Sequence, residues 1–323
     1  MNDSIAVKRY RRRFRRSLRT ARGAWVVREG FLLRVERDGV VGYGEVAPLP
    51  EFGSETVAEA EVFLRALVDD PALTVPDDLP CCAFGLSAAL RGGTGMRAYS
   101  VSALLPAGAD GSVKSSGKVA AGYRSLKWKI GVEPICEEIR LAGELLKSLP
   151  AGVRLRLDAN GGLSEDELGQ WLDVLGMFPD QVDYLEQPLP CGDEAVMAEY
   201  SASASVAIAL DESLNGVHGK RWLEPGAWRG PLVIKAALMG DVGALVSRLQ
   251  RVAGQVVLSS VFETGIGLEN SLGIVDGLPA VERPIGFDTV DAFEDALNSI
   301  KSKPTICEAA RCAYDPEAIW NLI

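Results

Sequence analysis

The chain has 323 residues, 47% of them hydrophobic, and a formal net charge of -10 at pH 7. One barrel of about 250 residues with a smaller domain fits this length better than two equal domains. The negative charge argues against nucleic acid or an anionic membrane as the main partner. No apolar run reaches the ~18 residues of a membrane span, and arginines occupy the N-terminal stretch where a signal peptide is apolar, so we expect a cytoplasmic protein.

Cysteine and histidine usage narrows the possible chemistry. None of the six cysteines forms a C-x-x-C pair, which predicts reduced thiols rather than a disulfide framework. His218 is the one histidine and lies in a turn-like segment. This argues against a Ser-His-Asp hydrolase, a histidine-ligated zinc site and a histidine general base. Acid–base chemistry is therefore expected from lysines or carboxylates.

The segment from Lys8 to Arg22 contains nine cations, with Tyr10 and Phe14 among them. One interpretation is a nucleic-acid-binding arm. The other is a first strand with an arginine-rich outward face, followed by a loop that meets an anionic substrate. The negative charge of the whole chain favours the second interpretation.

Residues 1–95 are typical of an α+β unit. Asp38-Gly39 separates two apolar runs and predicts a hairpin turn. The elements expected here are strands over Phe31–Arg37 and Val40–Val46 and helices over Thr56–Leu67 and Cys81–Leu90.

Residues 96–288 alternate short apolar strands with amphipathic helices, as parallel βαβ units do. The polar residues that close successive strands recur every 24 to 29 residues, the length of one strand plus one helix. Eight such units close a barrel, and residues 289–323 are expected to return to the first domain. The predicted strands are Ala98–Leu104, Ser125–Ile130, Val153–Asp158, Val182–Glu186, Val206–Asp211, Leu232–Lys235, Val256–Ser260 and Pro284–Phe287.

Three carboxylates, on Asp158, Glu186 and Asp211, end consecutive predicted strands and should meet at the C-terminal rim of the barrel, where barrel active sites lie. At 4 Å and an effective dielectric near 20, each pair of anions repels by about 4 kcal/mol, which a divalent cation would offset. All-oxygen ligation favours Mg²⁺ over zinc. The alternative is that the two aspartates cap helices and the glutamate forms a salt bridge.

Lysines accompany the carboxylates. Lys127 and Lys129 are two residues apart, so both point to one face of their strand. We expect them to lower each other's pKa, which would suit one of them as a general base. Lys235 lies four strands away, across the barrel mouth. The alternative is that these side chains extend to the solvent along the surface.

Arg156 lies on the same strand face as Asp158. An arginine inside a barrel strand needs an anionic partner. That partner is either a nearby acidic residue or the carboxylate of a substrate, and the residue pattern leaves both open.

Several motifs together resemble one family of enzymes. They are Lys127-Trp128-Lys129, Leu157-Asp158-Ala159-Asn160, Glu186-Gln187-Pro188, Leu210-Asp211-Glu212-Ser213 and Ile234-Lys235 in the barrel, with Phe14–Gly23, Gly42–Pro50 and Gly286–Thr289 outside or at the end of it. On these segments the chain resembles the enolase superfamily, and within it most closely the o-succinylbenzoate synthases. The resemblance implies an α/β barrel of the (β/α)7β type with an α+β capping domain, built from residues 1–95 and 289–323 around a catalytic barrel of residues 96–288.

The resemblance also implies a reaction. It is the Mg²⁺-dependent syn dehydration of 2-succinyl-6-hydroxy-2,4-cyclohexadiene-1-carboxylate to 2-succinylbenzoate via an enediolate, in menaquinone or phylloquinone biosynthesis. Lys129 would remove the proton α to the substrate carboxylate and then help hydroxide leave, while Lys127 and Lys235 would add positive charge. Mg²⁺, or Mn²⁺ in its place, would be held by the acids Asp158, Glu186 and Asp211.

By the same resemblance, the loops at Arg19–Gly23 and Pro50–Gly53 would close over a small carboxylate substrate. The side chains expected near it are Arg19, Asn160, Ser260 and Glu263, together with Arg156 if it is not paired within the protein. The stretch Val261–Gly265 is less polar than in some members, which bears on how the succinyl tail is recognised.

The competing interpretation within the superfamily is a dipeptide epimerase or N-acylamino acid racemase, because two opposed lysines also suffice for 1,1-proton transfer. An epimerase for free-amine dipeptides is expected to carry a D-x-D pair beyond the last strand. This chain has Asp288-Thr289-Val290-Asp291 instead, which favours the dehydratase. A catalytically inactive scaffold is the third interpretation, and the retention of all six charged groups argues against it.

Overall fold

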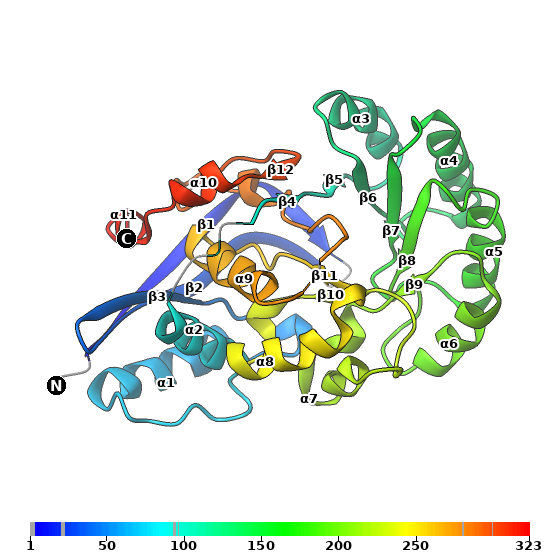
Figure 1. Ribbon diagram of the computed structural model, residues 1–323. Coiled ribbons are helices and arrows are strands. Elements are labelled where there is room, and N and C mark those ends of the chain that lie inside the picture. The colour runs from blue at the N-terminus through cyan, green and yellow to red at the C-terminus, as the bar shows by residue number, and fades with distance from the viewer. Residues whose placement is uncertain (1–3, 21–22, 93–94, 96, 280, 299) are drawn as a thin grey trace.

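The structure is a computed structural model and describes residues 4–20, 23–92, 95, 97–279, 281–298 and 300–323. An antiparallel sheet at one end carries the strands β1 (Ser4–Thr20), β2 (Gly23–Arg37) and β3 (Val40–Val46), in that order. A ring of parallel strands and helices forms the other end (Figure 1). The fold is therefore an α/β barrel with an α+β capping unit, as the sequence predicts.

The predicted hairpin is β2 and β3. Asp38 and Gly39 both have positive φ, at 52° and 78°, as a tight hairpin turn requires. β1 explains the arginine-rich segment, because Tyr10, Arg12 and Phe14 are buried while the residues between them are exposed. Alternation along a strand thus places part of the cationic run on its outward face.

Two helices, α1 (Val57–Asp69) and α2 (Pro80–Arg91), cover one face of this sheet at the predicted positions. α1 begins with a capping box between Thr56 and Glu59. α2 lies directly on β3, because a Cβ atom at Gly42 or Gly44 would stand 1.9 Å from a carbonyl oxygen of the helix. Glycine is therefore required at both positions for this close approach.

The first seven predicted barrel strands are present, and the eighth is reduced to isolated bridges. The first is split into β4 (Tyr99–Ser100) and β5 (Ala103–Leu105), and the eighth forms only bridges, from Val101 to Ile285 and from Ser259 to Gly286. These two bridges and a third between Leu210 and Leu232 close the ring. The strands between are β6 (Ser125–Lys129), β7 (Arg154–Asp158), β8 (Val182–Glu186), β9 (Ile208–Ala209), β10 (Leu232–Ile234) and β11 (Val256–Leu258).

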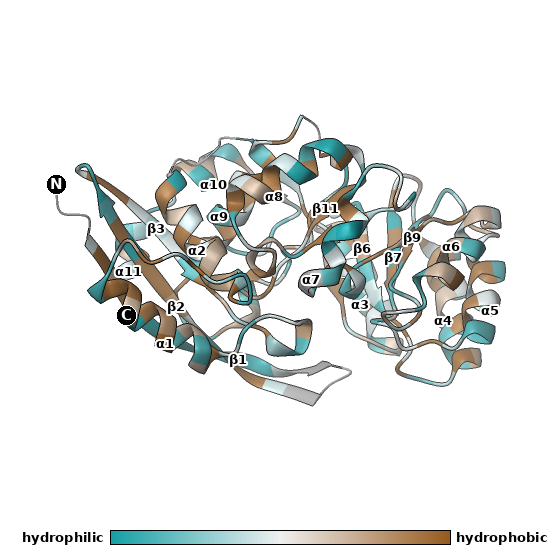
Figure 2. Ribbon diagram, turned by 90° about the horizontal axis from the view of Figure 1, so that it is seen from below, coloured by the Kyte–Doolittle hydropathy of each residue, from teal (hydrophilic) through white to brown (hydrophobic). Residues whose placement is uncertain are grey.

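Helices surround the barrel, and the amphipathic α4 and α5 show both polar and apolar colour in Figure 2. The connection from β9 to β10 is instead made of short helices, including α7 (Gly216–Gly219), which carries the exposed His218. No helix of the described residues is long and apolar enough to cross a membrane. The longer helices are α3 (Ala109–Ala120), α4 (Ile135–Ser148), α5 (Glu165–Leu175), α6 (Glu194–Ser203), α8 (Val242–Leu249) and α9 (Gly265–Asp276).

The C-terminal tail lies beside the first sheet, as Figure 1 shows. It contains β12 (Thr305–Ile306), which pairs with β4, and the helices α10 (Glu308–Cys312) and α11 (Pro316–Trp320). Trp320 is buried in a cluster with Tyr10 and Leu32, and its carbonyl accepts a hydrogen bond of 3.0 Å from Lys8. The division into residues 1–95 with 289–323 and residues 96–288 agrees with these contacts and stays a prediction.

Candidate active site at the mouth of the barrel

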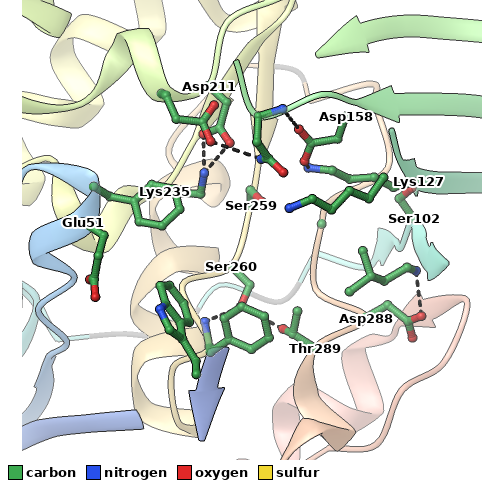
Figure 3. Close-up of a pocket in the computed structure, with 18 residues that line it drawn as sticks. Glu51, Ser102, Lys127, Asp158, Asp211, Lys235, Ser259, Ser260, Asp288 and Thr289 are labelled. Carbon is green, nitrogen blue, oxygen red and sulfur yellow. Dashed lines mark hydrogen bonds and ion pairs between the residues drawn. The ribbon is translucent and has the colours of Figure 1, made fainter. Parts of the chain in front are cut away.

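A cavity of about 210 Å³ lies at the C-terminal ends of the barrel strands. Barrel residues line most of it, and Figure 3 shows Lys127, Asp158 and Asp288 on one side with Lys235 and Glu51 on the other. Glu51 comes from the short helix η1 (Pro50–Phe52), so the loop expected to cover the substrate does border the cavity. The first domain therefore forms part of the wall.

The second predicted covering loop, Arg19–Gly23, is only partly described. Arg19 is a backbone partner of Ala24 near the end of the β1–β2 hairpin. Its side chain and residues 21–22 lie outside the described part of the chain, so the role predicted for Arg19 stays a prediction.

Three acids stand together because the register of the parallel strands places them together. Lys129 pairs in register with Asp158, and Asp158 with Glu186. The ammonium of Lys127 lies 2.9 Å from Oδ2 of Asp158 and 2.7 Å from Oε1 of Glu186. Asp211, after β9, forms a close ion pair with Lys235. All three carboxylates are buried.

The three lysines differ in their partners. Lys127 and Lys235 are paired with carboxylates, whereas Lys129 lines the cavity and its side chain has no hydrogen bond or ion pair with any residue that the structure describes. The Lys235 ammonium also lies 4.5 Å from the ring centre of Phe52, a cation–π contact with the capping unit.

The charges of the site shift several pKa values. Burial lowers the pKa of Lys127, but the nearby carboxylates of Asp158 and Glu186 outweigh it and raise that pKa well above its usual value. The expectation that neighbouring lysines depress the pKa of Lys127 is therefore wrong, because two anions lie closer to it than any cation. Burial also lowers the pKa of Lys235, but the carboxylate of Asp211 outweighs burial and raises that pKa above its usual value.

The carboxylates respond in opposite directions. Burial, reinforced by the charge of Asp158, raises the pKa of Glu186 well above its ordinary value, and Lys127 only partly opposes this. Burial also raises the pKa of Asp158, but the ammonium of Lys127 outweighs burial and lowers the pKa of that carboxyl below its usual value. Of these two acids, Glu186 is thus the one whose negative charge the protein compensates less well.

Comparisons with known proteins agree with this geometry. A family model described as the MenC N-terminal domain matches residues 9–92, and one described as enolase C-terminal domain-like matches residues 113–235. The o-succinylbenzoate synthase of Thermosynechococcus vestitus is 36% identical over 262 residues, covering 77% of this chain and 81% of that enzyme. The synthase of Yersinia pestis is 30% identical over 277 residues, covering 83% and 84%.

The chain belongs to the o-succinylbenzoate synthase family of the enolase superfamily. A solved o-succinylbenzoate synthase of Thermosynechococcus elongatus, with Mg in its active site, superposes with a TM-score of 0.83 at 31% identity, over 99% of this chain and 100% of that one. The L-Ala-D/L-Glu epimerase of Bacillus subtilis has a TM-score of 0.79 at 19% identity, over 94% and 95%. The second likeness concerns the fold alone, and both agree with a (β/α)7β barrel.

The residues of this synthase-family chain fit a hard divalent cation. Asp158, Glu186 and Asp211 offer only oxygen donors, and Oε2 of Glu186 is buried without a hydrogen-bond partner among the described residues. In the described ranges, no group of three Asp, Glu, His or Cys side chains is already arranged to hold a metal ion. The ammonium groups of Lys127 and Lys235 lie against the acids instead.

Residues around the acids hold them in place. Asn160 and Gln187 follow their strands with positive φ, 46° and 35°, which is uncommon for residues other than glycine. The backbone of Asn160 donates to Asp158 over 3.0 Å, and its side chain donates to Glu212 over 3.1 Å. The amide oxygen of Gln187 accepts a hydrogen bond of 3.0 Å from the backbone of Asp211. The two amides thus link the three strand ends of the synthase-family motif.

The structure brings only some of the predicted substrate contacts to the cavity. Asn160 and Ser260 line it. Glu263 does not, because it lies buried behind Ser260 and accepts hydrogen bonds from that hydroxyl and from the backbone of Val261. Glu263 therefore supports Ser260 in this structure, and its assignment as a substrate contact stays a prediction that the cavity lining does not support.

Arg156 has the partner that an arginine inside the barrel needs. Its Nε donates to Asp183 over 2.9 Å and its Nη1 to the carbonyl of Pro284 over 2.7 Å, and its side chain is only 1% exposed. It does not line the cavity. Of the two partners considered, the structure pairs Arg156 with the nearby acid, and the substrate-binding role of Arg156 stays a prediction without support from the cavity lining.

Nothing in the sequence pattern marks the aromatic wall of the cavity. Trp25 of β2, Phe52 of η1 and Phe262 after β11 line one side, with ring centres 6.1 Å apart for Trp25–Phe52 and 6.3 Å for Trp25–Phe262. These rings come from distant parts of the chain, so no local spacing predicts their meeting. The resemblance to the synthases pointed to the loop that contains Phe52 and to the stretch that contains Phe262, but not to Trp25.

Proposed function

We propose that this chain is an o-succinylbenzoate synthase, which dehydrates 2-succinyl-6-hydroxy-2,4-cyclohexadiene-1-carboxylate to 2-succinylbenzoate in menaquinone or phylloquinone biosynthesis. The family membership and the chemistry of the cavity both support this. The observation that carries the proposal is that the three cavity lysines differ in their partners. Among the described residues the side chain of Lys129 has no acidic partner, while Lys127 and Lys235 are ion-paired on either side of the cavity.

Lys129 is the proposed base. Its neutral amine would accept the proton from the ring carbon α to the substrate carboxylate, and the electron pair of that C–H bond would pass into the carboxylate as an enediolate. The returning electron pair would then form the ring double bond as the C–O bond at the neighbouring carbon breaks. The ammonium of Lys129 would give its proton to the departing hydroxide on the same face, so water leaves and the ring becomes aromatic.

Lys127 and Lys235 would act through charge. Both ammonium groups border the cavity beside the acids, and their raised pKa values keep them protonated at neutral pH. Positive charge fixed next to the substrate carboxylate stabilises the negative charge that develops there. Lys235, on the far side from Lys127 in Figure 3, would stay protonated throughout the dehydration.

Asp158, Glu186 and Asp211 are the proposed ligands of Mg²⁺, and Mn²⁺ suits the same oxygen donors. When bound, the cation supplies positive charge that lowers the energy of the enediolate. The solved relative from Thermosynechococcus elongatus holds Mg in its active site.

Asp291, the second acid beyond the last strand, gives little support to the epimerase alternative. Asp291 is exposed and accepts a hydrogen bond of 3.1 Å from the backbone of Ser302. It does not border the cavity. It is therefore not placed to hold the ammonium of a dipeptide.

The test is an ultraviolet assay that follows the cyclohexadiene carboxylate substrate with the purified chain. We expect turnover with Mg²⁺ and its loss in the presence of a chelator, restored by added Mg²⁺. Absence of turnover with Mg²⁺, together with racemisation of an N-acylamino acid under the same conditions, would overturn the proposal.

A further inference from the structure

Asp288, at the end of the last barrel strand, is an acid that faces the cavity without taking part in the mechanism above. It lines the cavity on the same side as Ser102 and Lys127 (Figure 3). Its side chain is 2% exposed. A buried carboxylate in this position needs a balancing charge or several hydrogen bonds.

Both oxygens of Asp288 accept hydrogen bonds from other residues of the protein. Oδ2 accepts a close contact from the ammonium of Lys118 and a hydrogen bond of 2.9 Å from the backbone of Leu104. Oδ1 accepts one of 2.9 Å from the hydroxyl of Tyr123. The donors therefore come from β5, from α3 and from the residues between α3 and β6, all outside the acid–lysine cluster.

Lys118 is the only one of these donors that carries a charge. It reaches Asp288 from α3 on the outside of the barrel, with its ammonium 4.9 Å from the ring centre of Tyr123. Lys118 itself does not line the cavity. Its charge nevertheless acts there, because it cancels the charge of an acid that does.

Whether the negative charge of Asp288 is compensated affects which class of substrate the cavity attracts. The proposed substrate carries two carboxylates, one on the ring and one on the succinyl tail. An uncompensated Asp288 would repel such a dianion and attract a ligand with an ammonium group, in a cavity whose low polarity strengthens both effects.

We propose that Lys118 is a specificity-determining residue. By neutralising Asp288 it makes the cavity accept a dicarboxylate and reject an amine-bearing ligand such as a dipeptide with a free N-terminus. This inference rests on the proposed function for the identity of the dianion, and on the contacts of Asp288 for the charge balance.

The test compares the two partners of the pair, because their removal changes the cavity charge in opposite directions. Lys118→Gln keeps a hydrogen-bond donor and loses the charge, so the KM for the cyclohexadiene carboxylate should rise about tenfold with kcat little changed. Asp288→Asn leaves the Lys118 charge unopposed, so KM should stay level or fall. The double variant should return KM close to the wild-type value, and Lys118→Arg is the charge-conserving control.

A second measurement uses L-alanyl-L-alanine as an inhibitor, since its ammonium is the group that a bare Asp288 would attract. Inhibition should strengthen in Lys118→Gln and weaken again in the double variant. If Lys118→Gln and Asp288→Asn both raise KM, or if the double variant is not rescued, the pair only supports the fold and the proposal is overturned. Thermal melts of all variants identify a variant that fails to fold.

The two proposals fail separately. Absence of turnover by the wild-type chain would count against the proposed function. In that case calorimetric titration with 2-succinylbenzoate, a dianion that needs no reaction, still measures the charge preference of the cavity. Equal affinity of the wild-type chain and of Lys118→Gln for that dianion would overturn the role of Lys118.

Discussion

Lys127 and Glu186 form a contact that uses only half of the carboxylate. The ammonium lies 2.7 Å from Oε1, whereas the buried Oε2 has no hydrogen-bond partner among the residues that the structure describes. A buried polar atom without a partner costs about 1–3 kcal/mol. Burial and the charge of Asp158 also raise the pKa of Glu186, against the effect of Lys127. The site is therefore expected to gain from an additional cation.

The first prediction concerns magnesium binding. Asp211→Asn and Glu186→Gln each remove one anionic donor, so each should weaken Mg²⁺ binding at least about tenfold in calorimetric titration without substrate. Asp166→Asn, on the exposed face of α5, is the matched control and should bind Mg²⁺ as the wild-type chain does. Wild-type affinity in both site variants would contradict the ligand assignment.

The second prediction concerns the base. Lys129→Ala removes the cavity lysine for which the described part of the chain offers no acidic partner, so kcat should fall by about two to four decades. Lys114→Ala, at an exposed position of α3, should leave kcat unchanged. Mg²⁺ affinity should stay within a few-fold of wild type, which separates loss of the base from loss of the metal site. Full activity of Lys129→Ala would remove Lys129 from the mechanism.

Much of this site could be predicted because residues that end successive parallel strands of a barrel lie at the same rim. A regular interval in the sequence therefore identifies residues that are close together in space. Asp158, Glu186 and Asp211 each follow an apolar strand, and the strand register then brings them to one rim. A barrel of eight strand–helix units follows from the same regular interval, whereas its (β/α)7β type was implied by the resemblance to the enolase superfamily.

Features set by contacts between distant segments could not be predicted in this way. Phe52 reaches Lys235 only because the capping unit lies over the barrel mouth, and Arg156 finds Asp183 on the neighbouring strand through a shift in register. The pKa of Lys127 depends on which charges lie nearest in space, and its neighbour in sequence is not one of them.

The third prediction separates structure from substrate binding at Arg156. Arg156→Met leaves the buried Asp183 with two longer ion contacts, of 3.7 Å to Arg154 and 3.5 Å to Arg283. Because a buried carboxylate then loses its closest cation, the free energy of unfolding should fall by about 3 kcal/mol. Urea unfolding measures this loss, and KM for the substrate should change less than about threefold. A large rise in KM at unchanged stability would instead make Arg156 a substrate ligand.

The last prediction concerns the pH dependence of stability through Glu263. Burial raises the pKa of Glu263 from its ordinary 4.5 to about 7, although the Ser260 hydroxyl opposes this by donating to the carboxylate. A carboxyl whose folded-state pKa is raised keeps its proton longer in the folded state. Its contribution to stability is therefore fully present below pH 4.5 and is lost as the pH rises through 7.

The loss amounts to at most about 3 kcal/mol for a shift of this size. Glu263→Gln cannot ionise, so its free energy of unfolding relative to wild type should rise between pH 5 and pH 8. Denaturant unfolding at a series of pH values measures this difference, in which the titration of every other group cancels. Glu199→Gln, at an exposed position of α6, should run parallel to wild type. If Glu263→Gln also runs parallel, the carboxyl is already ionised in the folded protein at pH 5 and the Ser260 contact outweighs burial.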